Sequence, residues 1–305
     1  MFLRVLSAAL LFTALTISAA PPSQKVPQSP PPSMLVQTEW LAAHLSDKNL
    51  VVLHVGADRT SYNMGHIPGA RFLALSDIVN FHGNIGNKLP AANDLKSAFE
   101  RLGVGDHSRV ILYGDMFGVL AARAYFTLDY LGHGSNAALL DGGLEKWARE
   151  HGTVQTVPTD VPSATLTARV RPELIVELPA LKETVADKTV VLIDARQPSD
   201  YAGAMPVQGI ARPGHIPGAR NVFWAEMLVS RDNPVLRPVS EIRARYASIG
   251  LRPGAKVIVY CQSGMQAAHD YFTLKLSGFR PVLYEGSFFD WSNAAGTPVE
   301  VGAGG

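Results

Sequence analysis

The sequence of 305 residues is poor in cysteine and contains a single one, Cys261. A single thiol cannot form an internal disulfide or supply a set of thiolate ligands for zinc. The chain also lacks an excess of charge of either sign, because it has 27 basic and 26 acidic residues. This balance excludes a typical nucleic-acid-binding protein, which needs a basic surplus for the phosphates. Neither a metal-ligand spacing nor a glycine-rich phosphate loop occurs, so we expect no metal and no cofactor.

Long hydrophobic runs are lacking as well. The apolar run Val5–Ile17 has 13 residues, whereas a membrane-spanning helix takes about 20. It follows Arg4 and precedes the small residues Ser18–Ala20, a pattern typical of a secretory signal peptide over residues 1–20. Six prolines within residues 21–33 predict an extended tether, which we place at 21–35. We therefore expect an exported, periplasmic bacterial protein with no membrane span in the mature chain.

The rest of the chain consists of two copies of an internal sequence repeat. Five segments recur in the same order at offsets between 144 and 149 residues. Such a long period indicates two homologous domains rather than a solenoid, and we place them at 36–156 and 172–301. The paired segments are 66–71 and 215–220, 102–104 and 249–251, 110–113 and 257–260, 125–128 and 271–274, and 141–147 and 285–291.

Within each copy, short β-branched runs alternate with segments of helical spacing. The runs, at 51–55, 110–113, 190–193 and 257–260, lack polar alternation, as strands buried on both faces of a parallel sheet do. The segments 239–248 and 266–277 predict helices, and Gly132 and Gly278 stand where helix C-terminal caps are expected. The fold class is therefore α/β, two tandem domains that each have a parallel sheet with helices on both faces.

Cys261 stands where such a sheet binds its ligands, directly after the predicted strand 257–260 and before a helix beginning near Ala267. The loop between them aims backbone N–H groups inward, and with the helix dipole they favour an anion, here a thiolate. Gly264 lets the backbone fold closely around the sulfur. The first copy has Gly114–Gly118 at this place, with no nucleophilic sulfur. We therefore predict that Cys261 is reactive rather than merely buried.

These segments resemble the rhodanese family. Residues 261–267 (Cys-Gln-Ser-Gly-Met-Gln-Ala) look like its active-site loop, while 215–219 and 284–291 resemble its two other signatures, and 194–196 its aspartate–arginine segment. The resemblance implies tandem rhodanese-like domains, an inactive first and a catalytic second. It also implies sulfur transfer: Cys261 attacks a small anionic donor such as thiosulfate, becomes a persulfide, and passes the sulfur to a thiophilic acceptor such as cyanide or a thiol.

The same resemblance implies the substrate-binding residues. The backbone of Gln262, Ser263, Gly264, Met265 and Gln266 would cradle the anion, since every intermediate is an anion held at one place.

Arg196 occupies the position at which an arginine of the family faces the loop and binds the donor. A planar guanidinium suits a sulfonate-like oxyanion. The other interpretation of Arg196 is a salt bridge. In the first copy Ala57 stands opposite it, so the charged group is absent where the cysteine is absent.

Several alternatives stay open. The loop has neither the basic residues common after the cysteine of thiosulfate-using members nor the Gly-Ser-Gly-Val-Thr of mercaptopyruvate-using members, so a 3-mercaptopyruvate sulfurtransferase is an alternative to the favoured thiosulfate enzyme. A non-catalytic persulfide carrier or sensor would share every motif. A cysteine phosphatase would need an arginine where Ala267 and Ala268 stand.

Other prominent residues are assigned to structure. His66 and His215 occur in both copies, and Trp147 and Trp291 are expected in the core. His269 is expected not to act as a base.

Overall fold

The computed structural model describes residues 33–82 and 85–302. The predicted signal peptide and residues 21–32 of the predicted tether lie outside the described residues, whereas the end of that tether, from Leu35, already forms strand β1 (Leu35–Val36). No helix in the described part is long and apolar enough to cross a membrane.

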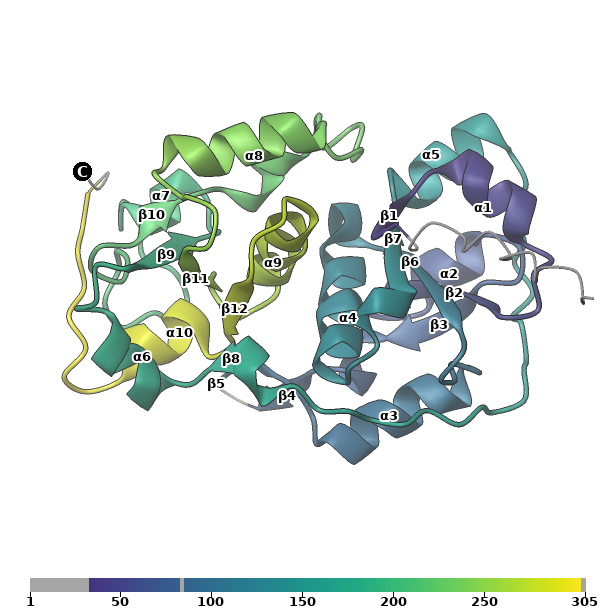
Figure 1. Cartoon of the computed structure of the whole chain (residues 1–305), viewed down its shortest axis with the longest axis horizontal. Helices are drawn as coiled ribbons and strands as arrows, with labels where there is room; N and C mark the ends of the chain where they lie inside the picture. Colours follow the sequence, from purple (N-terminus) through teal and green to yellow (C-terminus); the bar gives the residue numbers. More distant parts are fainter. Residues whose placement is uncertain (1–32, 83–84, 303–305) are drawn as a thin grey trace, which may run out of the picture. The chain divides into compact units, whose positions relative to one another are not determined.

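Two five-stranded parallel sheets form the framework (Figure 1). Each is built from one copy of the repeat, and the strand order is the same in both. The first runs β1, β7 (Ala137–Leu140), β6 (Arg109–Gly114), β2 (Leu50–Gly56), β3 (Arg71–Ala74). The second runs β8 (Ile175–Val176), β12 (Pro281–Tyr284), β11 (Lys256–Tyr260), β9 (Val190–Asp194), β10 (Arg220–Asn221). The four predicted strand runs are confirmed as β2, β6, β9 and β11.

Helices cover both faces of each sheet, because alternate strand residues face opposite ways. On the first sheet, Val51 and Leu53 pack with α3 (Ala92–Arg101) and α4 (Val119–Tyr130), while Val52 packs with α1 (Thr38–His44) and α5 (Gly143–Glu150). On the second, Val257 and Val259 pack with α8 (Val239–Ser248) and α9 (Gln266–Leu276). The opposite face packs with α6 (Leu178–Thr184), α7 (Pro198–Tyr201) and α10 (Ser287–Asn293). The predicted α/β class is therefore confirmed.

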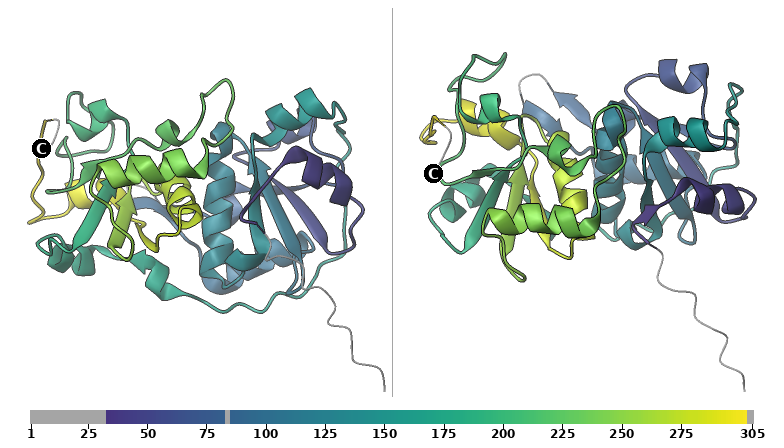
Figure 2. Two further views of the ribbon diagram at one scale, coloured as in Figure 1. Left: turned by 45° about the horizontal axis from the view of Figure 1, so that its top comes forward. Right: turned by 90° about the horizontal axis from the view of Figure 1, so that it is seen from above.

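Helix α4 of the first copy and helix α9 of the second pack side by side (Figures 1 and 2). They are the same segment of the repeat, and their aromatic rings meet in matched edge-to-face pairs, Tyr125 with Phe272 and Phe126 with Tyr271, both with ring centroids 4.9 Å apart. The buried core is continuous through this contact. As predicted, Gly132 and Gly278 follow the two helices in the left-handed conformation, at φ +86° and +87°.

One element departs from the repeat. Strands β4 (Asn80–His82) and β5 (Ile85–Lys88) form an antiparallel pair in the first copy, whereas the second copy has a single bridge between Leu228 and Leu236 at the corresponding place. Both segments leave a short 3-10 turn, η1 (Leu75–Asp77) or η5 (Trp224–Met227), and lead toward the next helix. Their ends contact the opposite copy, as described below.

Candidate active site

Cys261 follows β11 directly, at the carboxyl edge of the second sheet. Its side chain is 1% exposed and belongs to the same buried cluster as Val259 and Ala267. Tyr260, one residue earlier, belongs to the cluster on the other face with Phe288. Cys261 therefore lies on the face of the second sheet covered by α8 and α9.

The loop after Cys261 folds back on the sulfur. The backbone N–H of Gly264 donates to Cys261 Sγ across 3.1 Å, and α9 begins two residues later at Gln266. Gly264 has φ +91°, a conformation that costs other residues about 1–2 kcal/mol. A Cβ on Gly264 would lie 3.0 Å from the carbonyl oxygen of Glu285. The loop is thus both turned and crowded where it donates to the sulfur, and glycine suits both conditions.

Helix α10 fixes the outer side of the loop. The N–H groups of Phe288 and Phe289 donate to the carbonyls of Cys261 (2.9 Å) and Gln262 (3.0 Å). The Cys261 N–H itself donates to Ser287 Oγ across 3.3 Å. Both carbonyls are thereby held toward α10, and the N–H of Gly264, further along the loop, donates to the sulfur.

The remaining loop side chains differ in environment. Met265 is buried, and Gln262, Ser263 and Gln266 are half-buried. The Gln262 Oε1 atom is buried and has no hydrogen-bond partner among the described residues. Of the five predicted residues, Gln262 to Gln266, Gly264 is the one whose N–H donates to the sulfur, and the other four flank it in the same loop.

The first domain supplies contacts to this loop that sequence reasoning missed. Asn87, at β5, donates from its backbone N–H to Ser263 O (2.9 Å) and from Nδ2 to Ser263 Oγ (3.0 Å). Leu89 N–H donates to Glu285 Oε1 (2.8 Å). Arg123, on α4, donates from Nη2 to the same Oε1 (2.6 Å). An arginine within the apolar run of α4 was the available signal, because a fully buried charge requires a partner.

Arg196 forms no hydrogen bond with the loop in the described part of the chain. It is 1% exposed, and its guanidinium donates to both oxygens of Asp194 (2.5–3.1 Å) and to Gly214 O (2.7 Å). Its Cζ lies 4.0 Å from the ring centre of Phe288. Although burial opposes the charge, attraction to Asp194 raises the pKa of Arg196 above its ordinary value. Of the two interpretations of Arg196, its contacts match the salt bridge.

Arg212, three residues before His215, binds at the end of α10. Its guanidinium donates to the carbonyls of Trp291, Ser292 and Ala294 at the end of α10, over 2.8–3.1 Å. A cation at this end of a helix satisfies the free carbonyls. Among the described residues, therefore, neither Arg196 nor Arg212 donates to the Cys261 loop, whereas the Gly264 amide donates to the sulfur.

The residues assigned to structure make matching contacts in the two copies. His66 and His215 each stack on a tyrosine at 3.7 Å between ring centres. Trp147 and Trp291 are buried and donate Nε1–H to a backbone carbonyl across 2.7 Å.

His269 is buried, and burial lowers its pKa to about 4. It therefore stays neutral near pH 7.

The profile of the rhodanese-like domain matches residues 37–150 and 177–294. The chain belongs to the rhodanese family. It is 32% identical over 288 residues to the sulfur carrier protein TtuD of Thermus thermophilus, covering 89% of this chain and 98% of that protein. It is 30% identical over 284 residues to a thiosulfate sulfurtransferase of Corynebacterium glutamicum, with 89% and 91% covered.

Solved structures show the same two-domain rhodanese fold. The anaerobic ergothioneine biosynthesis enzyme of Chlorobium limicola superposes with a TM-score of 0.77 at 26% identity, over 88% of this chain and 70% of that one. A structure of an EanB variant with a cysteine persulfide and ergothioneine gives 0.76 at 26% identity, again over 88% and 70%. The expected membership in this family is confirmed, and the fold that it implied is the one observed.

Proposed function

We propose that the chain is a sulfurtransferase that moves sulfane sulfur from a small anionic donor, thiosulfate, to cyanide or a thiol through a persulfide on Cys261. The observation that carries the proposal is the Gly264 N–H that donates to Cys261 Sγ at the start of α9. Relatives of similar length are named for sulfur transfer and sulfur carriage, and a structural neighbour bears a cysteine persulfide.

The reaction has two displacement steps. In the first, the Cys261 thiolate attacks the outer sulfur of thiosulfate; the sulfur–sulfur bond of the donor breaks and its electron pair leaves with sulfite. In the second, cyanide attacks the outer sulfur of the persulfide, and the pair of that bond returns to the Cys261 sulfur. Both the thiolate and the persulfide are anions at one position, so a fixed set of amide donors and a helix N-terminus stabilises both.

The solitary cysteine makes the test specific. Purified protein incubated with thiosulfate should gain about 32 Da on Cys261, the mass of one sulfur, and should then form thiocyanate from cyanide over many turnovers. Cys261→Ser should lose both, since no second thiol is present. Absence of thiocyanate above the Cys261→Ser background with every donor would overturn the enzymatic proposal.

A persulfide carrier is the second candidate, favoured by the 32% identity to a protein named as a sulfur carrier. A carrier would gain the sulfur but turn over slowly with small acceptors. The remaining alternative is a 3-mercaptopyruvate sulfurtransferase, which the same assay tests with 3-mercaptopyruvate as donor. The donor with the higher kcat/KM is the anion that the site accepts.

We also propose that residues 1–20 direct export and are removed, leaving the domains 36–156 and 172–301 in the bacterial periplasm. N-terminal sequencing of protein recovered from the periplasm should begin at Pro21. Recovery of the intact N-terminus from the cytoplasm would contradict this.

A further inference from the structure

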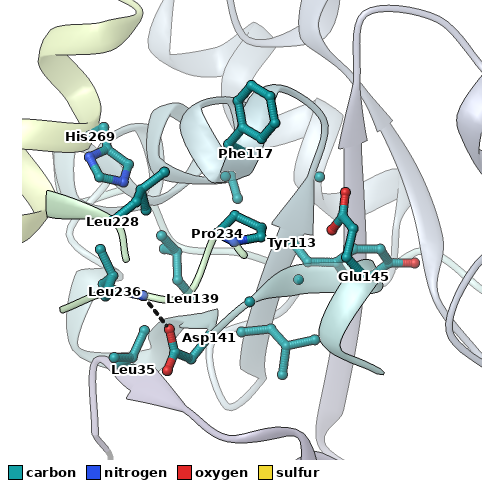
Figure 3. Close-up of a pocket in the computed structure, with 16 residues that line it drawn as sticks. Leu35, Tyr113, Phe117, Leu139, Asp141, Glu145, Leu228, Pro234, Leu236 and His269 are labelled. Carbon is teal, nitrogen blue, oxygen red and sulfur yellow. Dashed lines mark hydrogen bonds between the residues drawn. The ribbon is translucent and has the colours of Figure 1, made fainter. Parts of the chain in front are cut away.

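The two domains exchange equivalent contacts across their interface. Leu89 of the first domain donates its N–H to Glu285 Oε1 of the second (2.8 Å). Leu236 of the second donates its N–H to Asp141 Oδ1 of the first (2.9 Å), the dashed contact in Figure 3. Asp141 and Glu285 are equivalent positions of the repeat. Each domain therefore covers the carboxyl edge of its partner's sheet.

The helix residue at this contact differs between the two edges. His269 of α9 lines a cavity of about 30 Å³ that Asp141 also lines, beside the cysteine-free loop of the first domain (Figure 3). Its counterpart in the repeat, at the offset of Tyr125 and Tyr271, is Arg123 of α4. His269 is neutral near pH 7, whereas an arginine keeps its charge. At this helix position, therefore, the edge that carries the cysteine has a permanent cation and the other edge has a neutral histidine.

Arg123 is fully buried and only partly satisfied. Its Nη2 donates to Glu285 Oε1 (2.6 Å) and to Asn87 O (2.7 Å). Its Nε and Nη1 atoms are buried without a hydrogen-bond partner in the described part of the chain. Nη1 lies 3.8 Å from the place that a Cβ of Gly264 would take. The guanidinium therefore packs against the one residue whose N–H is bonded to the sulfur.

We propose that Arg123, supplied by the domain without a cysteine, is a positioning residue for the Cys261 loop. It joins Glu285 and Asn87, the two groups that flank the loop, and so holds Gly264 with its N–H on the sulfur. Its charge also favours an anionic sulfur over a neutral one. The persulfide part of this role rests on the proposed function, whereas the effect on the free thiol does not.

The test is the pH dependence of Cys261 alkylation by iodoacetamide, measured on the full chain by mass spectrometry. Arg123→Met should move the pH midpoint upward, and a rise of about one pH unit slows alkylation near pH 7 by about tenfold. Glu285→Gln removes the opposing carboxylate and should move the midpoint downward. Arg123→Lys keeps the charge, so its pH midpoint of alkylation should lie close to that of the parent.

Loosening of the domain interface would not produce opposite shifts. Lys275→Met is the matched control, because Lys275 also forms an ion pair across the α4–α9 contact, with Asp129, and lies near the far end of α9 from the loop. It should lower Tm and leave the alkylation profile unchanged. Equal profiles for Arg123→Met and the parent, or shifts of the same sign for the Arg123 and Glu285 variants, would overturn the proposal.

Alkylation needs no sulfur donor. If thiosulfate turnover is absent while the opposite shifts are found, the proposed function fails and the positioning role stands. If turnover is present and unaffected by Arg123→Met, the positioning role fails and the proposed function stands.

Discussion

Replacing Gly264 with alanine should lower the reactivity of the Cys261 sulfur while leaving the cysteine in place. At φ +91°, Gly264 lies in the left-handed region, and its N–H donates to Cys261 Sγ across 3.1 Å. A Cβ added there would lie 3.0 Å from the backbone oxygen of Glu285, a residue between β12 and α10. The loop must therefore shift or change its φ to accept a methyl group, and either change moves the N–H away from the sulfur.

The magnitude follows from two terms. Holding alanine in a left-handed conformation costs about 1–2 kcal/mol, and rotating out of it forfeits the hydrogen bond. A hydrogen bond to a charged group is worth about 1.5–3 kcal/mol. Since about 1.4 kcal/mol is a factor of ten, the rates of alkylation and of persulfide formation at Cys261 should fall by about ten- to a hundredfold.

Gly254→Ala is the matched control. Gly254, in the turn before β11, has φ +81° and no atom within 4 Å of the place a Cβ would take. It carries the same backbone strain away from the loop, so its stability should fall by about 1–2 kcal/mol while Cys261 reacts at the parent rate. Tm and the rate of iodoacetamide alkylation at fixed pH are measured for both variants.

Two results would refute the reasoning. If Gly264→Ala is folded and alkylated as fast as the parent, the loop amide does not set the reactivity of the sulfur. If Gly254→Ala loses reactivity to the same degree, backbone strain acts through stability and not through the position of Gly264.

Three further predictions concern groups around this site. Asn87→Ala and Ser263→Ala should show a coupling of about 0.5–1.5 kcal/mol in a double-mutant cycle of urea unfolding, and strictly additive effects would deny that their 3.0 Å bond contributes. Arg196→Met should destabilise the fold by about 3–5 kcal/mol, because Asp194 stays buried without its partner, and Arg196→Lys should leave KM for thiosulfate unchanged; a raised KM at parental Tm would restore a donor-binding role. Asp270 is fully buried, and burial raises its pKa well above 3.8, with Glu226 and Asp194 adding to the shift and Arg245 opposing it. The folded chain therefore keeps a proton that the unfolded chain releases, so stability falls as pH rises above 3.8. Asp270→Ala, which introduces the residue that the first copy has at this position (Ala124), should flatten the dependence of Tm on pH above about pH 4.

The sequence alone was sufficient for the elements that local patterns determine. The β-branched runs became β2, β6, β9 and β11, and the helix predicted at 239–248 has those bounds in the structure. The same periodicity placed Cys261 at a strand end, where the structure has it. These features follow from alternation, spacing and glycine, all of which act within a few residues.

Contacts between domains were beyond that reasoning. Asn87 and Arg123 reach the loop only because α4 docks on α9, and no pattern within either domain records how the two surfaces meet. The repeat held a partial signal. Aligning α4 with α9 sets Arg123 against His269, and a buried arginine in an otherwise apolar helix implies an acceptor outside its own domain.

The position of Arg196 could have been worked out from alternation. Leu192 packs on the face of the second sheet covered by α6, α7 and α10, and Ile193 packs on the opposite face. Continuing the alternation by two residues at a time places Asp194 and Arg196 on the face of Leu192. Cys261 follows Tyr260, which lies on that same face, so the cysteine belongs to the other one, with Ile193. The arginine and the sulfur therefore belong to opposite faces, and an anion at Cys261 depends on the Gly264 amide and on the cation that the first domain supplies.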